Sequence, residues 1–263
     1  MNIAFIPVRG GSKSIKLKNI KNICGKPLVY WVLEASNNSS VIDKVVVATD
    51  HIDIKKTVLS FNFNKVEIYD RDPKNAQDTS PTMDVILEYI NNSNISDEDN
   101  LFLIQATSPL LEPYHIDEMY EKMVKDKANS SLSCVEFKRF FWSKDGVSLN
   151  YDYRERPRRQ DFEGCMLENG ACYINSVYNI KNDKNLLSEP ISIYEMPEYT
   201  SIELDEEHDY YIIEKLIEKY KFLREEKRRE EKRREEKRRE EKRREEIKKY
   251  MIHLIVKNTS LNI

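Results

Sequence analysis

The amino-acid sequence predicts an α/β protein with a mostly parallel sheet and helices on both faces. Apolar runs typical of buried strands alternate with helical patterns through roughly the first 136 residues. Such alternation is expected when helical crossovers join parallel strands. The chain has 263 residues, which is enough for one catalytic domain whose core needs no disulfide or metal.

Each predicted element follows from a local pattern. Strands are predicted at short apolar runs, and helices where apolar residues recur at helical spacing or where a proline or a polar cap opens the segment. In chain order they are a strand at 3–8, a helix from Pro27, a strand at 44–49, a helix at 53–61, a strand at 66–69, a helix capped by Thr79-Ser80-Pro81 and running to Tyr89, a strand at 101–104, a helix from Pro113, and a strand at 131–136.

Residues 137–165 interrupt this alternation. Four aromatic side chains, Phe137, Phe140, Phe141 and Trp142, precede a basic segment at 153–161. The segment is interpreted as an inserted arm that makes a dimer contact.

Residues 1–223 are predicted to form the catalytic domain and residues 224–263 a charged tail. Residues 225–244 are four copies of Glu-Glu-Lys-Arg-Arg. A five-residue unit turns by roughly 140° per copy on an α-helix, so no apolar stripe forms. Pairs such as Glu225 with Arg229 favour a single charged helix, and a disordered tail is the alternative. Deletion of the tail is expected to leave activity intact.

Charge and composition narrow the function. The formal net charge is −3, and each repeat copy carries one excess positive charge, so the rest of the chain carries −7. Because the chain outside the repeats is acidic, general nucleic-acid binding is not expected, and we interpret the clustered arginines as part of a local site. The four cysteines form no Cys-x-x-Cys pair, so neither a disulfide framework nor a zinc site is expected. With no leader and no membrane-spanning stretch, a cytoplasmic location is expected.

The segment from Arg9 to Asn19 is predicted to bind a polyphosphate. Gly10 and Gly11 follow the first strand and leave their amides open to an anion. Four cations surround this turn, namely Arg9, Lys13, Lys16 and Lys18, which suits a nucleoside triphosphate. The loop matches neither common nucleotide fingerprint. From the loop alone, a solvated basic turn is an equally good interpretation.

Other polar motifs also follow predicted strands, at Thr49-Asp50-His51 and at Gln105-Ala-Thr-Ser-Pro109. Ligands of such sheets bind beyond the carboxyl ends of the strands, so these motifs are expected to converge. Gln105 is suited to a base edge or a sugar hydroxyl, and a helix-capping turn is the alternative. Arg71, with Asp78, Ser80 and Thr82, would hold a nucleotide from the opposite side.

Two charged clusters lie later in the chain. Glu203 and Asp205 are two residues apart, so in an extended segment both carboxylates face one side, which suits Mg²⁺. Acidic residues near a helix start are the alternative. Arginines at 154, 156, 158 and 159 flank Pro157 and suit carboxylate or phosphate oxygens, with a solvated charge run as the alternative.

Five ordered motifs together resemble the acylneuraminate cytidylyltransferases, the CMP-sialic acid synthetases. They are Arg-Gly-Gly-Ser-Lys with Leu-Lys-Asn, Gln-Ala-Thr-Ser-Pro, Arg-Pro-Arg-Arg-Gln-Asp, Glu-Asn-Gly-Ala at 168–171, and Ser-Ile-Glu-Leu-Asp. The similarity runs over nearly the whole chain up to the repeats. It implies a Rossmann-like nucleotide-diphospho-sugar transferase fold with an inserted dimerisation arm.

The resemblance also implies a role for each matching residue. Arg158 and Lys18 would be catalytic, and Glu203 with Asp205 would hold magnesium. The nucleotide CTP would be bound by Arg9, Gly10, Gly11, Ser12, Lys13, Asn19, Arg71, Ser80, Thr82 and Gln105. The acidic nine-carbon sugar would be bound by Gln105, Arg156, Arg159, Gln160 and Asn169. The family works as homodimers or dimers of dimers whose arms reach the neighbouring site.

Ser14, Thr82 and Glu203 depart from the family pattern, and Leu111 replaces an arginine of many bacterial relatives that is also missing in other members of the animal-like branch. Of these, Glu203 bears most directly on the metal. The implied reaction is transfer of CMP from CTP to the anomeric hydroxyl of N-acylneuraminic acid, with release of pyrophosphate. The alternatives are the same reaction on legionaminic, pseudaminic or Kdo acid, or a non-catalytic nucleotide-binding scaffold. No nucleic-acid or membrane partner is expected.

Overall fold

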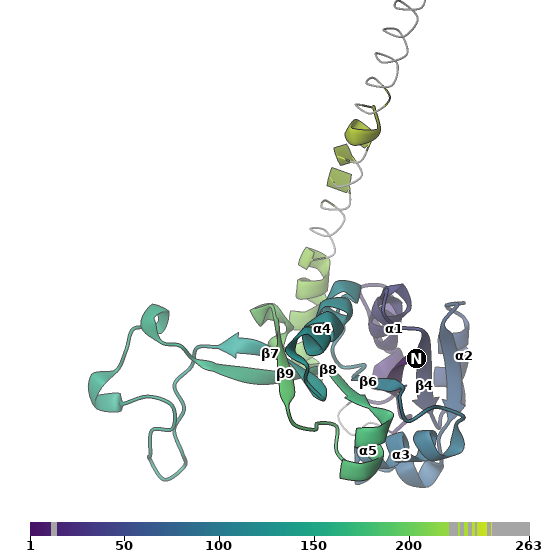
Figure 1. The fold of residues 1–263 in the computed structure, drawn as a ribbon, viewed down its shortest axis with the longest axis horizontal. Coiled ribbons are helices and arrows are strands. Elements are labelled where there is room, and N and C mark those ends of the chain that lie inside the picture. The colour runs from purple at the N-terminus through teal and green to yellow at the C-terminus, as the bar shows by residue number, and fades with distance from the viewer. Residues whose placement is uncertain are drawn as a thin grey trace, which may run out of the picture. The chain divides into compact units, whose positions relative to one another are not determined.

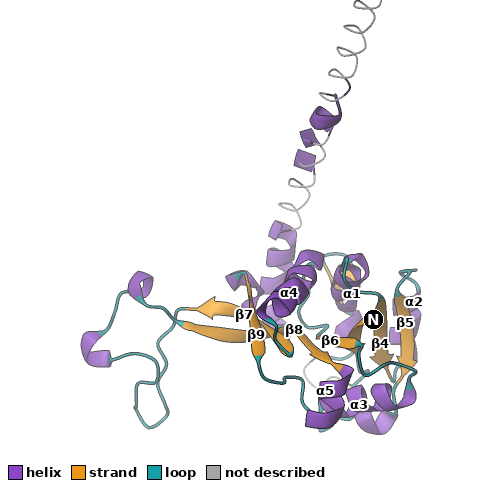
Figure 2. Cartoon of the chain, viewed as in Figure 1, coloured by secondary structure: helices purple, strands orange, loops and turns teal. Residues whose placement is uncertain are grey.

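A seven-stranded sheet organises the described residues of the first part of the chain (Figures 1 and 2). Its strands are β1 (Asn2–Pro7), β4 (Lys44–Thr49), β5 (Val66–Asp70), β6 (Asn100–Ile104), β7 (Ser130–Phe137), β8 (Cys165–Ser176) and β9 (Ile191–Met196). They lie in the order β5-β4-β1-β6-β8-β7-β9. Within this sheet only β8 runs against its neighbours, which confirms the mostly parallel sheet.

The computed structural model describes residues 1–11, 15–220, 226, 229–230, 233–234, 236–240 and 243. The chain divides into two compact units, Met1–Leu216 and Ile217–Ile263, and each is described by itself. Ser12 and Lys13 lie outside the described residues, as does most of the repeat segment.

Helices cover both faces of the sheet, as the sequence predicts. Side chains alternate along β1, so Ala4 and Ile6 pack into one apolar cluster, and Ile3 and Phe5 into another. The first cluster includes residues of α1 (Leu28–Asn38), α2 (Ile52–Leu59) and α4 (Pro113–Asp126), and the second includes residues of α3 (Thr82–Asn92) and α5 (Val177–Asp183). Because both faces are covered, β1 reads as a continuous apolar run.

The other described elements are short. They are the hairpin strands β2 (Asn22–Ile23) and β3 (Lys26–Pro27), and the 3₁₀ turns η1 (Lys18–Ile20), η2 (Pro73–Ala76), η3 (Tyr153–Glu155), η4 (Arg159–Asp161) and η5 (Glu198–Ser201). A further helix occupies 207–220.

The start of α3 differs from the predicted cap. Pro81 itself is the N-cap residue, with φ −60° and no capping side chain. Its fixed φ suits the extended geometry of an N-cap. The Ser80 hydroxyl donates instead to the Lys74 carbonyl at 2.8 Å, so it closes the preceding loop. The strands β8 and β9 and the helix α5 are not among the predicted elements.

The chain changes direction in the sheet between β1 and β6. From β1 it passes through α1 to β4 and through α2 to β5, and then returns through α3 to β6 on the other side of β1. This is a topological switch point, where open α/β sheets bind their ligands. The carboxyl ends of β1 and β6, at Pro7 and Ile104, therefore mark the expected site.

The arm leaves the sheet between β7 and β8 and extends away from the helices (Figure 1). Phe140 lies at its centre, with the rings of Tyr151 and Phe162 at 4.3 and 4.9 Å between centroids. The Arg156 guanidinium lies over the Phe140 ring at 4.6 Å. The arm thus has a small aromatic cluster of its own. Its contact with a second subunit stays a prediction.

In the second unit, the described residues at 217–220, 226, 229–230, 233–234, 236–240 and 243 are helical. Arg234 and Glu230 form an i,i+4 ion pair at 2.8 Å, of the kind the repeat predicts. Glu225, Arg244 and the apolar end of the chain lie outside the described residues. A search of the described helices finds none that combines the length and apolarity needed to cross a bilayer.

Candidate nucleotide site

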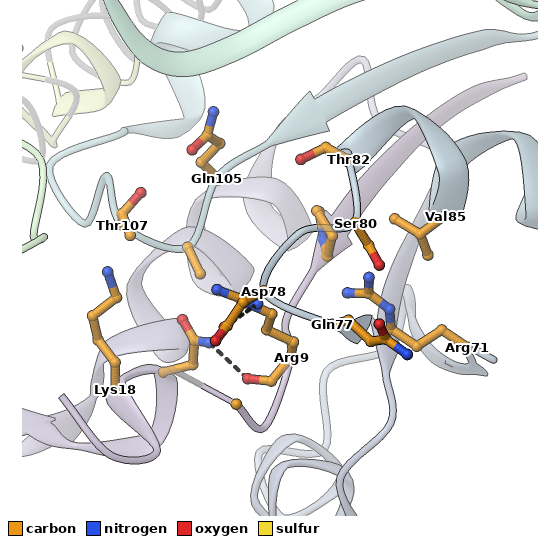
Figure 3. Close-up of a pocket in the computed structure, with 14 residues that line it drawn as sticks. Arg9, Lys18, Arg71, Gln77, Asp78, Ser80, Thr82, Val85, Gln105 and Thr107 are labelled. Carbon is orange, nitrogen blue, oxygen red and sulfur yellow. Dashed lines mark hydrogen bonds and ion pairs between the residues drawn. The ribbon is translucent and has the colours of Figure 1, made fainter. Parts of the chain in front are cut away.

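A cavity of about 270 Å³ lies at the switch point between β1 and β6 (Figure 3). Segments that follow β1, β5 and β6, together with the start of α3, supply its walls. The lining residues are Pro7, Arg9, Gly11, Lys18, Asn19, Arg71, Gln77, Asp78, Ser80, Thr82, Val85, Gln105, Ala106 and Thr107. The predicted convergence of motifs at strand ends is therefore observed for the segments after β1 and β6.

The glycine loop is fixed by residues that follow β4. The Gly10 amide donates to Asp50 Oδ1 at 3.0 Å. A Cβ on Gly10 would lie 2.5 Å from the His51 ring carbon Cδ2, so any side chain at residue 10 would displace that ring. Asp50 and His51 thus hold the glycine loop in place, and only glycine fits at residue 10. The Gly10 amide is bonded to a carboxylate in this structure, so it is not open to an anion as predicted.

Arg9 projects from this loop into the cavity. Its Nη1 forms an ion pair with Asp78 Oδ1 at 2.7 Å, and the two side chains point toward each other (Figure 3). The buried side chain of Asn19 donates to the Arg9 carbonyl at 3.3 Å. In this structure Asn19 therefore holds the backbone from which the Arg9 side chain projects.

Arg71 enters the cavity from the segment after β5 and is only 7% exposed. Its guanidinium donates to the Asn75 carbonyl. Burial is the main cause that lowers the pKa of Arg71, and the nearby carboxylates of Asp50 and Glu88 oppose that change. Within the described part of the chain, Arg71 Nε is buried with no hydrogen-bond partner.

Hydroxyl and amide groups complete the walls. Ser80 and Thr82 lie on one side, and Gln105 and Thr107 on the other (Figure 3). Among the described residues, Thr107 Oγ1 is also buried without a partner. The arrangement suits a polar ligand that is held on opposite sides by neutral donors and acceptors.

Lys18 links the cavity to the segment that carries Glu203 and Asp205. Its ammonium donates to the Leu204 carbonyl at 2.7 Å and to Asp205 Oδ1 at 3.2 Å. The Leu204 amide in turn donates to the Thr107 carbonyl at 3.0 Å. The acidic pair is thereby fixed beside the segment that follows β6.

Glu203 is a partly buried carboxylate in an acidic environment. Burial is the main cause that raises its pKa, Asp205 and Glu168 raise it further, and Lys18 opposes them. Two carboxylates of this kind suit a hard divalent cation that keeps water and phosphate oxygens as its other ligands. No group of three or more acidic, histidine or cysteine side chains suited to a metal occurs in the described residues, so a metal here would depend on such additional ligands.

Asn169 occupies a different place from the cavity wall. It is 1% exposed, its Oδ1 accepts from the Ser133 hydroxyl at 2.7 Å, and its amide donates to Thr200 Oγ1 at 3.2 Å. These bonds join β7, β8 and η5, the turn that immediately precedes Glu203. In this chain Asn169 therefore holds in place the segment that contains Glu203 and Asp205, the candidate metal ligands.

The arm residues do not line the cavity of their own chain. The Arg158 side chain is 75% exposed and pairs with Asp161 at 2.6 Å, and Arg159 pairs with Glu198 at 3.4 Å. Arg156 lies over Phe140, and Gln160 lies within η4. Of the described residues that are predicted to bind the nucleotide, all except Gly10 line the cavity, and the arginine arm lies apart from it.

Several residues of this site were not predicted from the sequence, among them Gln77 and Gly170. Gln77 lines the cavity, and it lies directly before Asp78 in a loop with no sequence motif of its own. Gly170, at φ +66°, has the Glu203 carboxylate packed where its side chain would begin. Gly170 belongs to the Glu-Asn-Gly-Ala motif, so the sequence marks it as a residue of interest. Its contact with Glu203 is visible only in the folded chain.

Comparison with known families gives a match to "Cytidylyltransferase" over residues 3–161. The N-acylneuraminate cytidylyltransferase of Oncorhynchus mykiss is 38% identical over 228 residues, which cover 83% of this chain and 51% of that protein. N-acylneuraminate cytidylyltransferase A of Danio rerio is 35% identical, with 85% and 52% covered. This chain spans about half the length of these relatives.

More distant similarity extends to other cytidylyl enzymes. A pseudaminic acid cytidylyltransferase of Campylobacter jejuni is 24% identical, covering 79% of this chain and 92% of that protein. A structure of CMP:2-keto-3-deoxy-manno-octonic acid synthetase complexed with CTP has a TM-score of 0.61 at 17% identity, covering 83% of this chain and 99% of that chain. A 4-diphosphocytidyl-2C-methyl-D-erythritol synthase from Anaerococcus prevotii also has a TM-score of 0.61, at 13% identity, with 82% and 96% covered. These two likenesses concern the fold.

Proposed function

This chain belongs to the cytidylyltransferase family, and we propose that it transfers CMP from CTP to the anomeric hydroxyl of an N-acylneuraminic acid. The products are CMP-sialic acid and pyrophosphate. The observation that carries the proposal is the convergence of Arg9, Lys18 and Arg71 in one cavity at the switch point. The choice of sugar is supported by relatives named for N-acylneuraminate at 34–38% identity.

In the proposed reaction the protein would align the anomeric hydroxyl with the α-phosphate and neutralise the negative charge of the phosphates. The anomeric oxygen attacks the α-phosphorus, the bond from that phosphorus to the bridging oxygen breaks, and the hydroxyl proton passes to solvent. Arg9 and Lys18 would bind the polyphosphate oxygens, and Lys18 would offset the charge of the departing pyrophosphate. Gln105, Ser80, Thr82 and Arg71 would hold the nucleoside, so that the α-phosphate is presented at a fixed position.

Glu203 and Asp205 would hold a magnesium ion, which supplies positive charge to the phosphate oxygens when bound. Their position beside the segment after β6 supports this assignment, because the Leu204 amide between them donates to the Thr107 carbonyl of the cavity wall. The Lys18 ammonium would have to share or release the Asp205 carboxylate when the metal binds. The pKa of Glu203 is raised first by burial and then by Asp205, and a bound cation would offset both penalties on the ionised carboxylate.

We further propose that the arm acts on the cavity of a neighbouring subunit in a homodimer or a dimer of dimers. Arg158 is exposed and apart from its own cavity, which supports a role in trans. There it would meet the sugar carboxylate or the charge that develops at the α-phosphate, with Arg156, Arg159 and Gln160 beside it. Asn169 would act through the segment that carries Glu203. We expect this chemistry in the cytoplasm.

The same reaction on pseudaminic acid is the second candidate, because a pseudaminic acid cytidylyltransferase is similar over 79% of this chain. Legionaminic acid and Kdo would need the same chemistry at the anomeric hydroxyl.

The test measures pyrophosphate release by the purified chain with CTP and Mg²⁺, offering N-acetylneuraminic, pseudaminic, legionaminic and Kdo acids separately. Release with N-acetylneuraminic acid supports the proposal. Release with another acid alone would transfer the proposal to that sugar. Binding of CTP without turnover on any of the four would favour the non-catalytic binding protein.

A further inference from the structure

The cavity contains a negative charge where a polyphosphate ligand would bind. Of the described residues that line it, Asp78 is the only acid, against the three cations Arg9, Lys18 and Arg71. Asp78 lies in the loop between η2 and α3, and its carboxylate pairs with the Arg9 guanidinium at 2.7 Å (Figure 3). An anion that approaches Arg9 must therefore displace Asp78 or lie beside it.

The ion pair between Arg9 and Asp78 contributes little to the stability of the fold, so Arg9 can exchange Asp78 for a ligand. Its side chains are 32% and 39% exposed, and partly exposed pairs contribute little to folding. Arg9 can therefore change partner at small cost. The Asp78 carboxylate would nevertheless stay within the cavity, where its repulsion of a bound anion is less screened than in open solvent.

Repulsion by Asp78 acts unequally on the two forms of a nucleoside triphosphate. The free anion carries more negative charge than its magnesium complex, so it meets the larger penalty beside a fixed carboxylate. With Asp78 present, the cavity lining has a smaller net positive charge, which suits the less charged complex. A cavity of arginines and lysines alone would favour the free anion.

We propose that Asp78 is a specificity-determining residue that makes this cavity select the magnesium complex of a polyphosphate over the free anion. The proposal deepens the proposed function, on which it rests for the identity of the ligand, CTP. Discrimination at this step would keep Arg9 from holding metal-free nucleotide in an unproductive complex.

The experiment compares the wild-type protein with Asp78→Asn in binding titrations at low ionic strength. The probes are CTP and inorganic tripolyphosphate, each with EDTA and with saturating Mg²⁺, and no sugar is present. We expect Asp78→Asn to tighten binding of both free anions on the order of 10-fold, and binding of their magnesium complexes, which carry about half the negative charge, by only about three-fold. A second neutral variant, Asp78→Ser, should give the same pattern.

Asp84→Asn is the matched control, since it removes the same charge from the first turn of α3 and Asp84 does not line the cavity. It should bind all four probes as the wild type does. Equal changes for the free and complexed forms, weaker binding of the free anions, no change, or no binding of either probe to the wild type would each overturn the proposal.

Failure of the proposed function gives a different result. If tripolyphosphate shows the Asp78 effect while CTP does not bind to any variant, the selectivity stands and the assignment of CTP falls. If CTP turns over with the sugar acid and the Asp78 variants retain wild-type selectivity, the function stands and only this inference fails.

Discussion

The Glu203 carboxylate is packed against Gly170, in the space where a side chain at residue 170 would begin. A Cβ there would lie 2.9 Å from Glu203 Cδ and closer still to Oε1. The backbone at Gly170 also has φ +66°, a region that favours glycine. Gly170 thus leaves room for one of the two carboxylates assigned to magnesium, and it joins two motifs that are far apart in the sequence.

Replacing Gly170 by alanine should displace Glu203 and weaken the use of Mg²⁺. We expect the half-saturating Mg²⁺ concentration to rise on the order of 10-fold, because second-shell changes at metal sites have effects of this size. Pyrophosphate release as a function of Mg²⁺ measures it.

Gly25→Ala is the control for backbone strain in this experiment. Gly25 also has a positive φ, of +77°, but nothing lies within 4 Å of its added Cβ. It should lose stability without a change in Mg²⁺ requirement. Equal Mg²⁺ requirements for Gly170→Ala and the wild type would contradict the role given to the packed carboxylate.

Glu203→Gln should stabilise the metal-free protein while abolishing its response to Mg²⁺. The folded-state pKa of Glu203 is raised, first by burial and then by Asp205. Ionised Glu203 therefore costs stability in full once the pH is above its raised folded pKa. This cost shrinks as the pH falls below that value and is absent below the unfolded pKa.

A neutral glutamine removes this cost, so the melting temperature in EDTA at neutral pH should rise by roughly 1–4 °C. The difference between variant and wild type should shrink in acidic buffer. Thermal melts across pH measure both effects, and a lower melting temperature at neutral pH would show that the ionised carboxylate stabilises the fold.

Arg158→Ala should lower turnover on the order of 10²-fold or more, and the loss should be repaired in trans. Lys18→Ala removes a residue of the cavity, whereas Arg158→Ala removes one of the arm. If each arm serves the neighbouring cavity, a mixed dimer of the two variants contains one intact site.

Random mixing after mild dissociation should then restore about a quarter of wild-type activity. Arg154→Ala, which removes an exposed arginine stacked on Tyr153, is the control for charge loss in the arm. If the mixtures of the two variants are as inactive as each variant alone, Arg158 acts on the cavity of its own chain or takes no part in the mechanism.

Removal of residues 224–263 should leave turnover within about two-fold of wild type, because no residue assigned to the site lies beyond Asp205. Steady-state rates of the truncated and full chains test this. A large loss of activity in a truncated protein that melts like the full chain would give the repeats a catalytic role.

Much of the fold could be predicted from the sequence because parallel strands buried on both faces read as apolar runs. The runs at β1, β4 and β6 are short and unbroken, and each ends in polar residues. β8 and β9 were harder to predict, because β8 begins within the arm, and in β9 the isoleucines at 191 and 193 are exposed while Ser192 is buried, so the apolar pattern does not follow the burial. The Lys18 ammonium donates to the Leu204 carbonyl, and these two residues are 186 positions apart in the sequence. A contact of this kind depends on tertiary packing, so no local sequence pattern predicts it.

The site divides in the same way. Arg9, Lys18 and Gln105 follow strands whose ends meet, so their convergence could be foreseen. The pairing of Arg9 with Asp78, the contact of Gly10 with His51 and the burial of Asn169 could not, since each joins segments whose register is set only by the folded chain. The roles of Ser12, Lys13 and the arm arginines stay predictions.

Competition between sugar acids in one vessel tests whether the chain transfers CMP to N-acylneuraminic acid. The purified chain would receive CTP, Mg²⁺ and equal concentrations of N-acetylneuraminic, pseudaminic, legionaminic and Kdo acids, and mass spectrometry would quantify the CMP-sugars formed. We expect CMP-N-acetylneuraminic acid as the main product, formed with an equal amount of pyrophosphate and absent when EDTA replaces Mg²⁺. A different CMP-sugar as the main product, or consumption of CTP with no CMP-sugar at all, would contradict it.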